Sequence, residues 1–498
     1  MQIEFDQKTV SCRRESFRQT KLIQEHAECI VSDIYEDIGK IVFAKSQLFL
    51  KGKDLTAHGA SVSVCADISV FYITEGLDRI RCISLSKDFS IDFDSDSIAA
   101  DSILQVSFSP QGVQARAVNS RKIAVQFSAA AELVAWAADS FAVSVQIGAN
   151  DQNGLELLEE KKDCLVTTDV TEKSFVISEQ LPLQPDGETP TQIICAHAEL
   201  SCSEQQMIGS KLLLKGGAAI SFRYETVSGS VPGYAEQWVP FSVLIDSPGE
   251  DAEIGRILLQ ATALYVTLGE AVNGTQIVET ELHAVAQISF QTRIETKYIS
   301  DMYSTRFPLC CDNCIRTVCT GQSECRHIER AEDQSELDEK TYMTAAVEGE
   351  ALSCVVRDGK AFASVIVSTV LKADDGSMTG VQKLLSLETP LPSGVCELLG
   401  TKVLSREARV EENRVVFSVE AAFDFLCLEY SDLNTVTAAE LDEEREYNAA
   451  QTPALTLVLK NDHNVWELAK QYRSSMAAIT ELNEKFDLPE NVLMIPQI

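Results

Sequence analysis

The sequence predicts a mainly β protein: three tandem antiparallel β-sandwich-like repeats, followed by a small α+β domain with the order strand, helix, helix, strand. Apolar and polar residues alternate over most of the chain, as they do in half-buried strands. A β pattern recurs three times, and helical spacing appears after Pro453. The 498 residues exceed the roughly 250–300 that one core supports, so we expect several domains.

One strand near the middle of each repeat shows the recurrence. It runs over Ala60–Tyr72 in the first copy, Lys211–Tyr224 in the second and Lys360–Leu371 in the third. The last residues of these stretches are 152 and 147 positions apart. Because a fixed interval is typical of duplicated units, we interpret the chain as a triplication.

A long hairpin is predicted at the end of each copy. The Asn273-Gly274 pair in the second copy favours a tight turn, because both residues tolerate positive φ. We expect five segments: repeats over 1–150, 151–300 and 301–436, an acidic linker over 437–451, and the small domain over 452–498. The paired strands are Leu104–Phe108 with Ile123–Phe127, Ile257–Leu268 with Gln276–Phe290, and Lys402–Val410 with Arg414–Cys427.

Helices are expected only at the two ends of the chain. Arg14–Glu25 is predicted to form a short N-terminal helix. Near the C-terminus, Leu455–Leu459 predicts a strand, Asn464 and Ser475 are candidate N-caps of two helices, and Val492–Pro496 predicts the closing strand.

The C-terminal segment resembles the LysM family. Three motifs occur in order: Val465–Tyr472, Ile479–Asn483 and Leu493–Pro496. The resemblance implies two helices on a two-stranded sheet, and many members bind N-acetylglucosamine polymers such as peptidoglycan. A simpler interpretation is that Trp466 and Tyr472 are core residues of a small domain.

The segment departs from the family where glycines are usual. Asp462-His463-Asn464 replaces Gly-Asp-Thr, and Glu490-Asn491 replaces Gly-Gln. Because glycine lets a backbone approach a sugar closely, these changes argue against glycan binding. The candidate partner- or glycan-binding residues are Asp462, His463, Asn464, Lys470, Arg473 and Ser474.

Three acidic β repeats before a LysM-like module resemble the clostridial SPOCS-domain proteins. Tyr72 and Phe89 in the first copy match Tyr224 and Phe241 in the second, whereas the third copy lacks this pattern. The resemblance implies a non-enzymatic scaffold in the mother-cell cytoplasm, at the forespore surface, whose tail recruits a spore-coat morphogenetic ATPase. The alternative function is that of a peptidoglycan-binding cell-wall protein.

A cysteine-rich stretch precedes the third repeat and is the one candidate for metal chemistry. Zinc prefers four thiolate or imidazole ligands in a tetrahedron. Unligated thiols and redox cross-linking are the alternatives. The candidate zinc ligands are Cys311, Cys314, Cys319 and Cys325.

Charge and hydropathy narrow the function further. The net charge of −33 repels phosphate backbones, so we expect no nucleic-acid partner, and it favours a partner with a basic surface. No apolar run reaches the roughly 18 residues of a membrane span, and from the acidic, alternating first residues we expect no secretory signal. The six histidines lie in no catalytic motif, so we expect no enzymatic activity.

Overall fold

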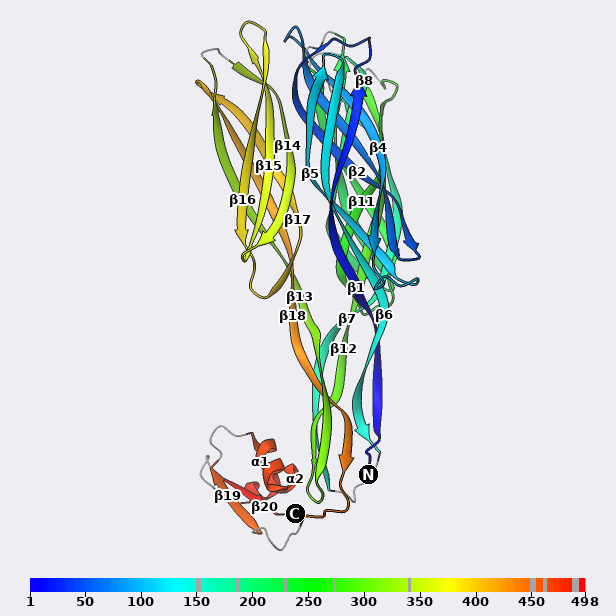
Figure 1. The fold of residues 1–498 in the computed structure, drawn as a ribbon, viewed down its shortest axis with the longest axis vertical. Coiled ribbons are helices and arrows are strands. Elements are labelled where there is room, and N and C mark those ends of the chain that lie inside the picture. Colours follow the sequence, from blue (N-terminus) through cyan, green and yellow to red (C-terminus); the bar gives the residue numbers. More distant parts are fainter. Residues whose placement is uncertain are drawn as a thin grey trace.

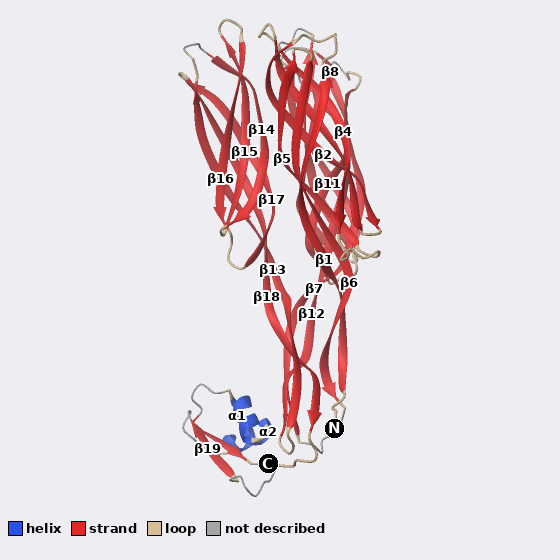
Figure 2. Ribbon diagram, in the orientation of Figure 1, coloured by secondary structure: helices blue, strands red, loops and turns tan. Residues whose placement is uncertain are grey.

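The computed structural model describes residues 1–148, 154–183, 189–227, 229, 231–272, 275–338, 342–447, 454–459, 464–485 and 492–497. Strands account for nearly all of the regular structure, and two short helices lie near the C-terminus (Figure 2). Every strand pairing is antiparallel. The predicted mainly β, antiparallel class is therefore confirmed.

Eighteen of the strands fall into three sets of six, which we call units 1, 2 and 3. In each unit the first strand pairs with the sixth and the sixth with the fifth, while the second, third and fourth form another sheet. The sheets are β1-β6-β5 and β2-β3-β4, then β7-β12-β11 and β8-β9-β10, then β13-β18-β17 and β14-β15-β16. The strands are β1 (Phe5–Ile30), β2 (Ile38–Thr56), β3 (Gly59–Thr74), β4 (Ile80–Asp94), β5 (Ile103–Asn119), β6 (Lys122–Ile147), β7 (Leu155–Leu183), β8 (Pro190–Ile208), β9 (Lys211–Thr226), β10 (Gly233–Asp246), β11 (Ala252–Leu268), β12 (Gln276–Ser304), β13 (Leu309–Glu336), β14 (Tyr342–Arg357), β15 (Lys360–Ala373), β16 (Met378–Pro390), β17 (Val395–Glu411) and β18 (Arg414–Leu441).

The three predicted central strands lie within β3, β9 and β15, each the middle strand of its sheet. They carry the most regularly buried apolar residues because both of their edges are paired and one face meets the second sheet. Each unit buries large aromatic rings between its sheets. These include Phe93 in unit 1, Phe222 and Phe290 in unit 2, and Phe417 and Phe423 in unit 3.

The first and last strands of every unit continue beyond the sheets as a two-stranded ribbon. The three ribbons lie side by side and form a stalk below the bodies of the units (Figure 1). The stalk comprises 5–12 with 139–147, 155–166 with 292–304, and 309–319 with 430–441. All three ribbons contribute side chains to one apolar core, which contains Val10, Phe141, Cys164, Tyr298, Val318 and Leu433. The units are therefore joined by a shared core at this end.

Two sequence-based expectations are wrong. The N-terminal segment Arg14–Glu25 is part of β1, not a helix, and it pairs with β6 except at a register shift between Glu15 and Phe17. The cysteine-rich stretch does not precede the third unit but forms β13, which is the first strand of that unit. In addition, β18 runs to Leu441, five positions into the expected linker. Among the described residues, no helix has the length and apolarity needed to cross a bilayer.

Candidate functional site

The C-terminal module contains β19 (Leu455–Leu459), α1 (Val465–Tyr472), α2 (Met476–Glu484) and β20 (Val492–Pro496), in the predicted order. The two strands pair with each other as an antiparallel ribbon. Both predicted N-caps are present, because Asn464 Oδ1 accepts the backbone N–H of Trp466 at 3.2 Å and Ser475 Oγ accepts that of Ala478 at 3.1 Å. These bonds satisfy N–H groups that a helix start leaves unpaired.

The module packs against the end of the stalk through α1. The Trp466 ring lies edge-to-face on Tyr303 of β12, with ring centroids 4.9 Å apart. Its indole Nε1–H donates to the Asp301 carboxylate at 2.8 Å, and Lys470 Nζ donates to both oxygens of that carboxylate at 2.7 Å. One acidic side chain of unit 2 therefore receives two donors from one face of α1.

A β-bulge explains why Asp301 faces the module. The register between β12 and β7 shifts between Ile299 and Asp301, leaving one extra residue on β12. Such a bulge changes the direction in which the following side chains project. Two residues further on, the Tyr303 hydroxyl donates to the Ser474 carbonyl. Burial first, and then the nearby acidic groups, raises the pKa of Tyr303, so this hydroxyl keeps the proton that it donates.

The structure places four of the six predicted binding residues in contacts within the protein. Asn464 caps α1, and Lys470 binds Asp301. Arg473 lies with its guanidinium 3.4 Å from the centre of the Tyr447 ring. Ser474 is completely buried, and its hydroxyl donates to the Pro496 carbonyl. Asp462 and His463 lie outside the described residues, as do Glu490 and Asn491.

A different surface of the module is left open. Leu455, Leu457 and Leu459 alternate along β19 and are 46%, 64% and 56% exposed. The sheet to which β19 belongs has only two strands, so one edge of β19 has no ladder partner among the described residues. Exposed apolar side chains beside an unpaired strand edge are typical of a surface that accepts another chain. The alternation was visible in the sequence, but its outward direction was not.

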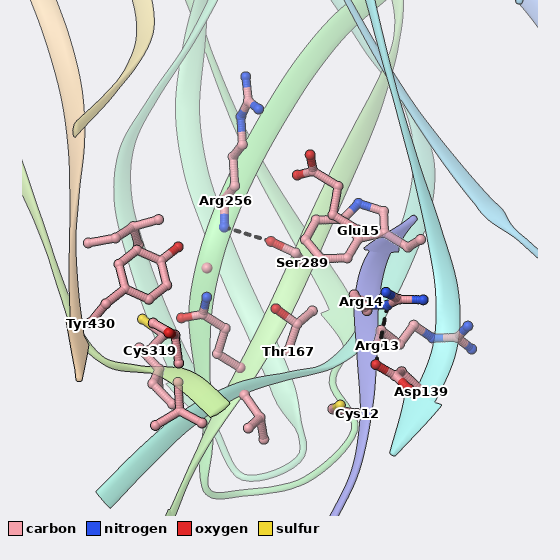
Figure 3. A pocket seen from close by; sticks show the side chains of 18 of the residues that line it. Cys12, Arg13, Arg14, Glu15, Asp139, Thr167, Arg256, Ser289, Cys319 and Tyr430 are labelled. Carbon is pink, nitrogen blue, oxygen red and sulfur yellow. Dashed lines mark hydrogen bonds and ion pairs between the residues drawn. The ribbon is translucent and has the colours of Figure 1, made fainter. Parts of the chain in front are cut away.

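A second notable site lies where the bodies of the units meet the stalk. A cavity of about 630 Å³ is lined by side chains of all three units, including Arg13, Trp136, Thr167, Arg256 and Tyr430 (Figure 3). We call it the junction cavity. Its lining mixes apolar rings with arginine and acidic side chains. Sequence patterns could not indicate this cavity, because its residues come from strands far apart in the chain.

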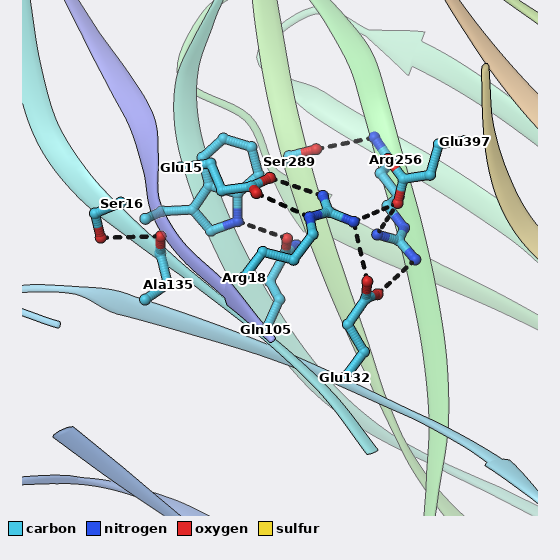
Figure 4. Close-up of polar contacts among 10 residues, drawn as sticks. Glu15, Ser16, Arg18, Gln105, Glu132, Ala135, Arg256, Ser289 and Glu397 are labelled. Carbon is cyan, nitrogen blue, oxygen red and sulfur yellow. Dashed lines mark hydrogen bonds and ion pairs between the residues drawn. The ribbon is translucent and has the colours of Figure 1, made fainter. Parts of the chain in front are cut away.

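Four alternating charges hold the units together beside this cavity (Figure 4). Glu397 of unit 3 accepts from Arg18 of unit 1 at 2.5 Å and from Arg256 of unit 2 at 2.8 Å. Glu132 binds the same two arginines at 3.1 and 3.3 Å. Burial opposes the charge on Arg18, but the hydrogen bond to Glu15 and the surrounding carboxylates outweigh it and raise the pKa of this guanidinium.

The four candidate zinc ligands do not converge. They lie along one extended strand, so at about 3.3 Å per residue the distance from Cys311 to Cys325 is roughly 45 Å. Cys314 is exposed, and the Sγ of Cys319 contacts the Gly321 carbonyl at 3.4 Å. Within the described part of the chain, no group of three or more His, Cys, Asp or Glu side chains could hold a metal ion.

Comparisons with known proteins do not assign the chain to a family. The chain matches no protein-family model, no curated protein and no solved structure.

Proposed function

We propose that the protein is a non-enzymatic assembly scaffold of the spore envelope, in which three sandwich-like copies of one unit support a LysM-like module that recruits a coat morphogenetic protein. The six-strand arrangement that recurs in units 1, 2 and 3 supports the triplication. The strand–helix–helix–strand order of the module supports the LysM-like assignment. The sequence resemblance to SPOCS-domain proteins supports the biological setting.

The observation that carries this proposal is the way in which the module is mounted. One face of α1 is fixed to the stalk by Trp466 and Lys470, while the leucines of β19 remain exposed. In Figure 1, β19 lies on the side of the module away from the stalk. A module held by one face and open at an apolar strand is suited to presenting a docking surface to a partner.

The partner that fits this surface is a protein that has an exposed apolar segment surrounded by positively charged residues. The charge of −33 attracts a basic protein over long range, so association should be faster at low salt. Pairing with the open edge of β19 would satisfy the backbone groups of both chains, and the leucines would supply apolar contact. A spore-coat morphogenetic ATPase is the partner implied by the family resemblance.

The test measures binding of the purified full-length chain to a purified spore-coat morphogenetic ATPase. Burial of one leucine contributes about 1.5–3 kcal/mol, so Leu457→Lys should weaken binding roughly 10- to 100-fold. Lys485→Ala, which removes an exposed ion pair on α2, is the matched control and should bind like the parent. Amide exchange over residues 299–304 and 464–485 establishes that each variant keeps its module folded and docked.

Two results would count against the proposal. Unchanged ATPase binding by Leu457→Lys would exclude β19 as the docking surface. Retention of the chain on insoluble peptidoglycan, lost on deletion of residues 452–498 and without any ATPase binding, would support the cell-wall alternative instead.

A further inference from the structure

Three cysteines lie together on one face of the β13-β18-β17 sheet of unit 3. Cys396 of β17 and Cys427 of β18 are directly opposite each other in the register. Their sulfur atoms are 2.9 Å apart, closer than two unbonded sulfurs normally pack. Both side chains are partly buried.

The backbone geometry at this pair is compatible with a disulfide. Directly opposed residues of antiparallel strands have Cα atoms about 4.5–5.5 Å apart. Disulfides span Cα separations of about 4.4–6.8 Å. A bond between Cys396 and Cys427 therefore requires little movement of the strands, unlike a bond between cysteines spread along β13.

A third thiol stands beside this pair. Cys325 of β13 is paired with Phe425, two positions from Cys427, so both cysteines project to the same face. Burial, and then the neighbouring Cys427 sulfur, raises the pKa of Cys325. Burial and the contact with Cys396 likewise raise the pKa of Cys427. A thiol next to a disulfide can attack it and exchange with it.

The position of the pair connects it to the contact between units. Cys396 lines the junction cavity and directly precedes Glu397, which binds Arg18 of unit 1 and Arg256 of unit 2. The register of β17 with β18 shifts shortly afterwards, between Leu398 and Gly400. The start of β17 is thus a short paired segment between a loop and a bulge. It carries Glu397, the acidic residue that binds arginines of the other two units.

We propose that Cys396 and Cys427 are an oxidation site that forms a reversible cross-strand disulfide and thereby fixes Glu397 at the junction of the three units. The oxidant is a low-molecular-weight disulfide. Cys396 gives its proton to solvent, and its thiolate attacks one sulfur of the oxidant, forming a mixed disulfide and expelling one small thiolate. Cys427 then loses its proton and attacks the Cys396 sulfur, which releases the second small thiolate.

The step oxidises two protein thiols and reduces one small disulfide to two thiols. The thiolate is the reacting form, so the raised pKa of Cys427 makes closure slow at neutral pH and faster as the pH rises. The Cys325 thiolate can attack the Cys427 sulfur, which forms a Cys325–Cys427 bond and releases the Cys396 thiolate; two small thiols then reduce the new bond and leave as one small disulfide. Substitution of Cys325 by serine should leave formation of the bond intact and slow its reduction by small thiols.

Peptide mapping tests the site directly. The reduced full-length protein is incubated with glutathione disulfide, quenched in acid, alkylated and digested. The predicted product links the Cys396 and Cys427 peptides, with the loss of two hydrogens and with Cys325 alkylated. Alkylation of both Cys396 and Cys427, or a dominant bond between Cys325 and Cys427, would overturn the proposal. This readout uses the parent chain, so it does not depend on the folding of any variant.

Amide exchange tests the consequence for the junction. Oxidation should slow exchange at residues 395–400 in the parent and in Cys202→Ser, which removes an exposed cysteine elsewhere in the chain. It should leave exchange there unchanged in Cys396→Ser. Formation of the bond without any slowing at residues 395–400 would refute its coupling to Glu397.

Discussion

Replacement of Asp301 by alanine should release the C-terminal module from the stalk. The Asp301 side chain is 27% exposed and accepts from Trp466 Nε1 and from Lys470 Nζ. A hydrogen bond to a charged group contributes about 1.5–3 kcal/mol, whereas an exposed ion pair contributes about 0.2–1 kcal/mol. Because Lys470 is 45% exposed, the indole bond should dominate.

The expected loss is roughly 2–3 kcal/mol, which lowers the ratio of docked to undocked module roughly 30- to 150-fold. The module itself should remain folded. Its core residues Leu468, Ala469, Ile479 and Ile495 contact one another within the module, and although Tyr303 and Leu158 of the stalk pack on this core, Asp301 is not part of it. The apolar contact of Trp466 with Tyr303 also remains, so undocking should be partial.

Amide exchange and tryptophan fluorescence measure this change. Exchange should increase at the end of β12, around Tyr303. The summed emission of the three tryptophans should shift to longer wavelength as the Trp466 indole meets water. Lys485→Ala, at the exposed C-terminal end of α2, should change neither signal. Equal exchange at residues 299–304 in Asp301→Ala and the parent would show that Asp301 does not hold the module.

Three further predictions concern the units. Burial and nearby positive charge lower the pKa of His197. As the pH falls, this histidine is protonated in the unfolded chain before it is protonated in the folded one, so the free energy of unfolding should be full above about pH 6.5 and fall below it. Denaturant titrations at several pH values should show a smaller fall in His197→Gln. Arg256→Met leaves two carboxylates with only one arginine, so urea unfolding should show a loss of roughly 3 kcal/mol; an unchanged midpoint would show that the four-charge network contributes nothing. Gly217→Ala places a Cβ 2.2 Å from the Trp238 ring and should lower the free energy of unfolding by roughly 1–3 kcal/mol, whereas Gly249→Ala, with no atom within 4 Å, should leave it nearly unchanged; equal unfolding midpoints for the two variants would contradict this packing.

The sequence correctly predicted those strands and helices whose formation depends on short-range residue patterns. Alternation located the central strands β3, β9 and β15, and the change of spacing after Pro453 located both C-terminal helices. It failed at β1, where the apolar residues between Arg14 and Glu25 do not alternate regularly with polar ones. In the structure Phe17 and Ile23 pack on the unit 1 core while Leu22 is 80% exposed, and a register shift near Glu15 interrupts the alternation. The secondary structure of that segment is determined by its pairing with a strand more than a hundred residues away.

The site was harder to predict than the fold, for the same reason. Lys470, Arg473 and Ser474 were candidates for a partner surface, but they contact the stalk, Tyr447 of the linker and the rest of the module, respectively. Nothing within the module's own sequence points to Asp301, which is more than 160 positions away and is turned toward α1 by a bulge. Likewise, the Cys396–Cys427 pair depends on the β17–β18 register, which cysteine spacing cannot reveal.

The central claim is that the stalk holds the module by α1 while β19 receives the partner. The most direct measurement compares the affinity of a purified coat morphogenetic ATPase for the parent chain, Leu457→Lys and Asp301→Ala. We predict a large loss of affinity for Leu457→Lys and retained affinity for Asp301→Ala, whose β19 leucines are intact. Retained affinity in Leu457→Lys together with a loss in Asp301→Ala would contradict the account and place the partner at the stalk.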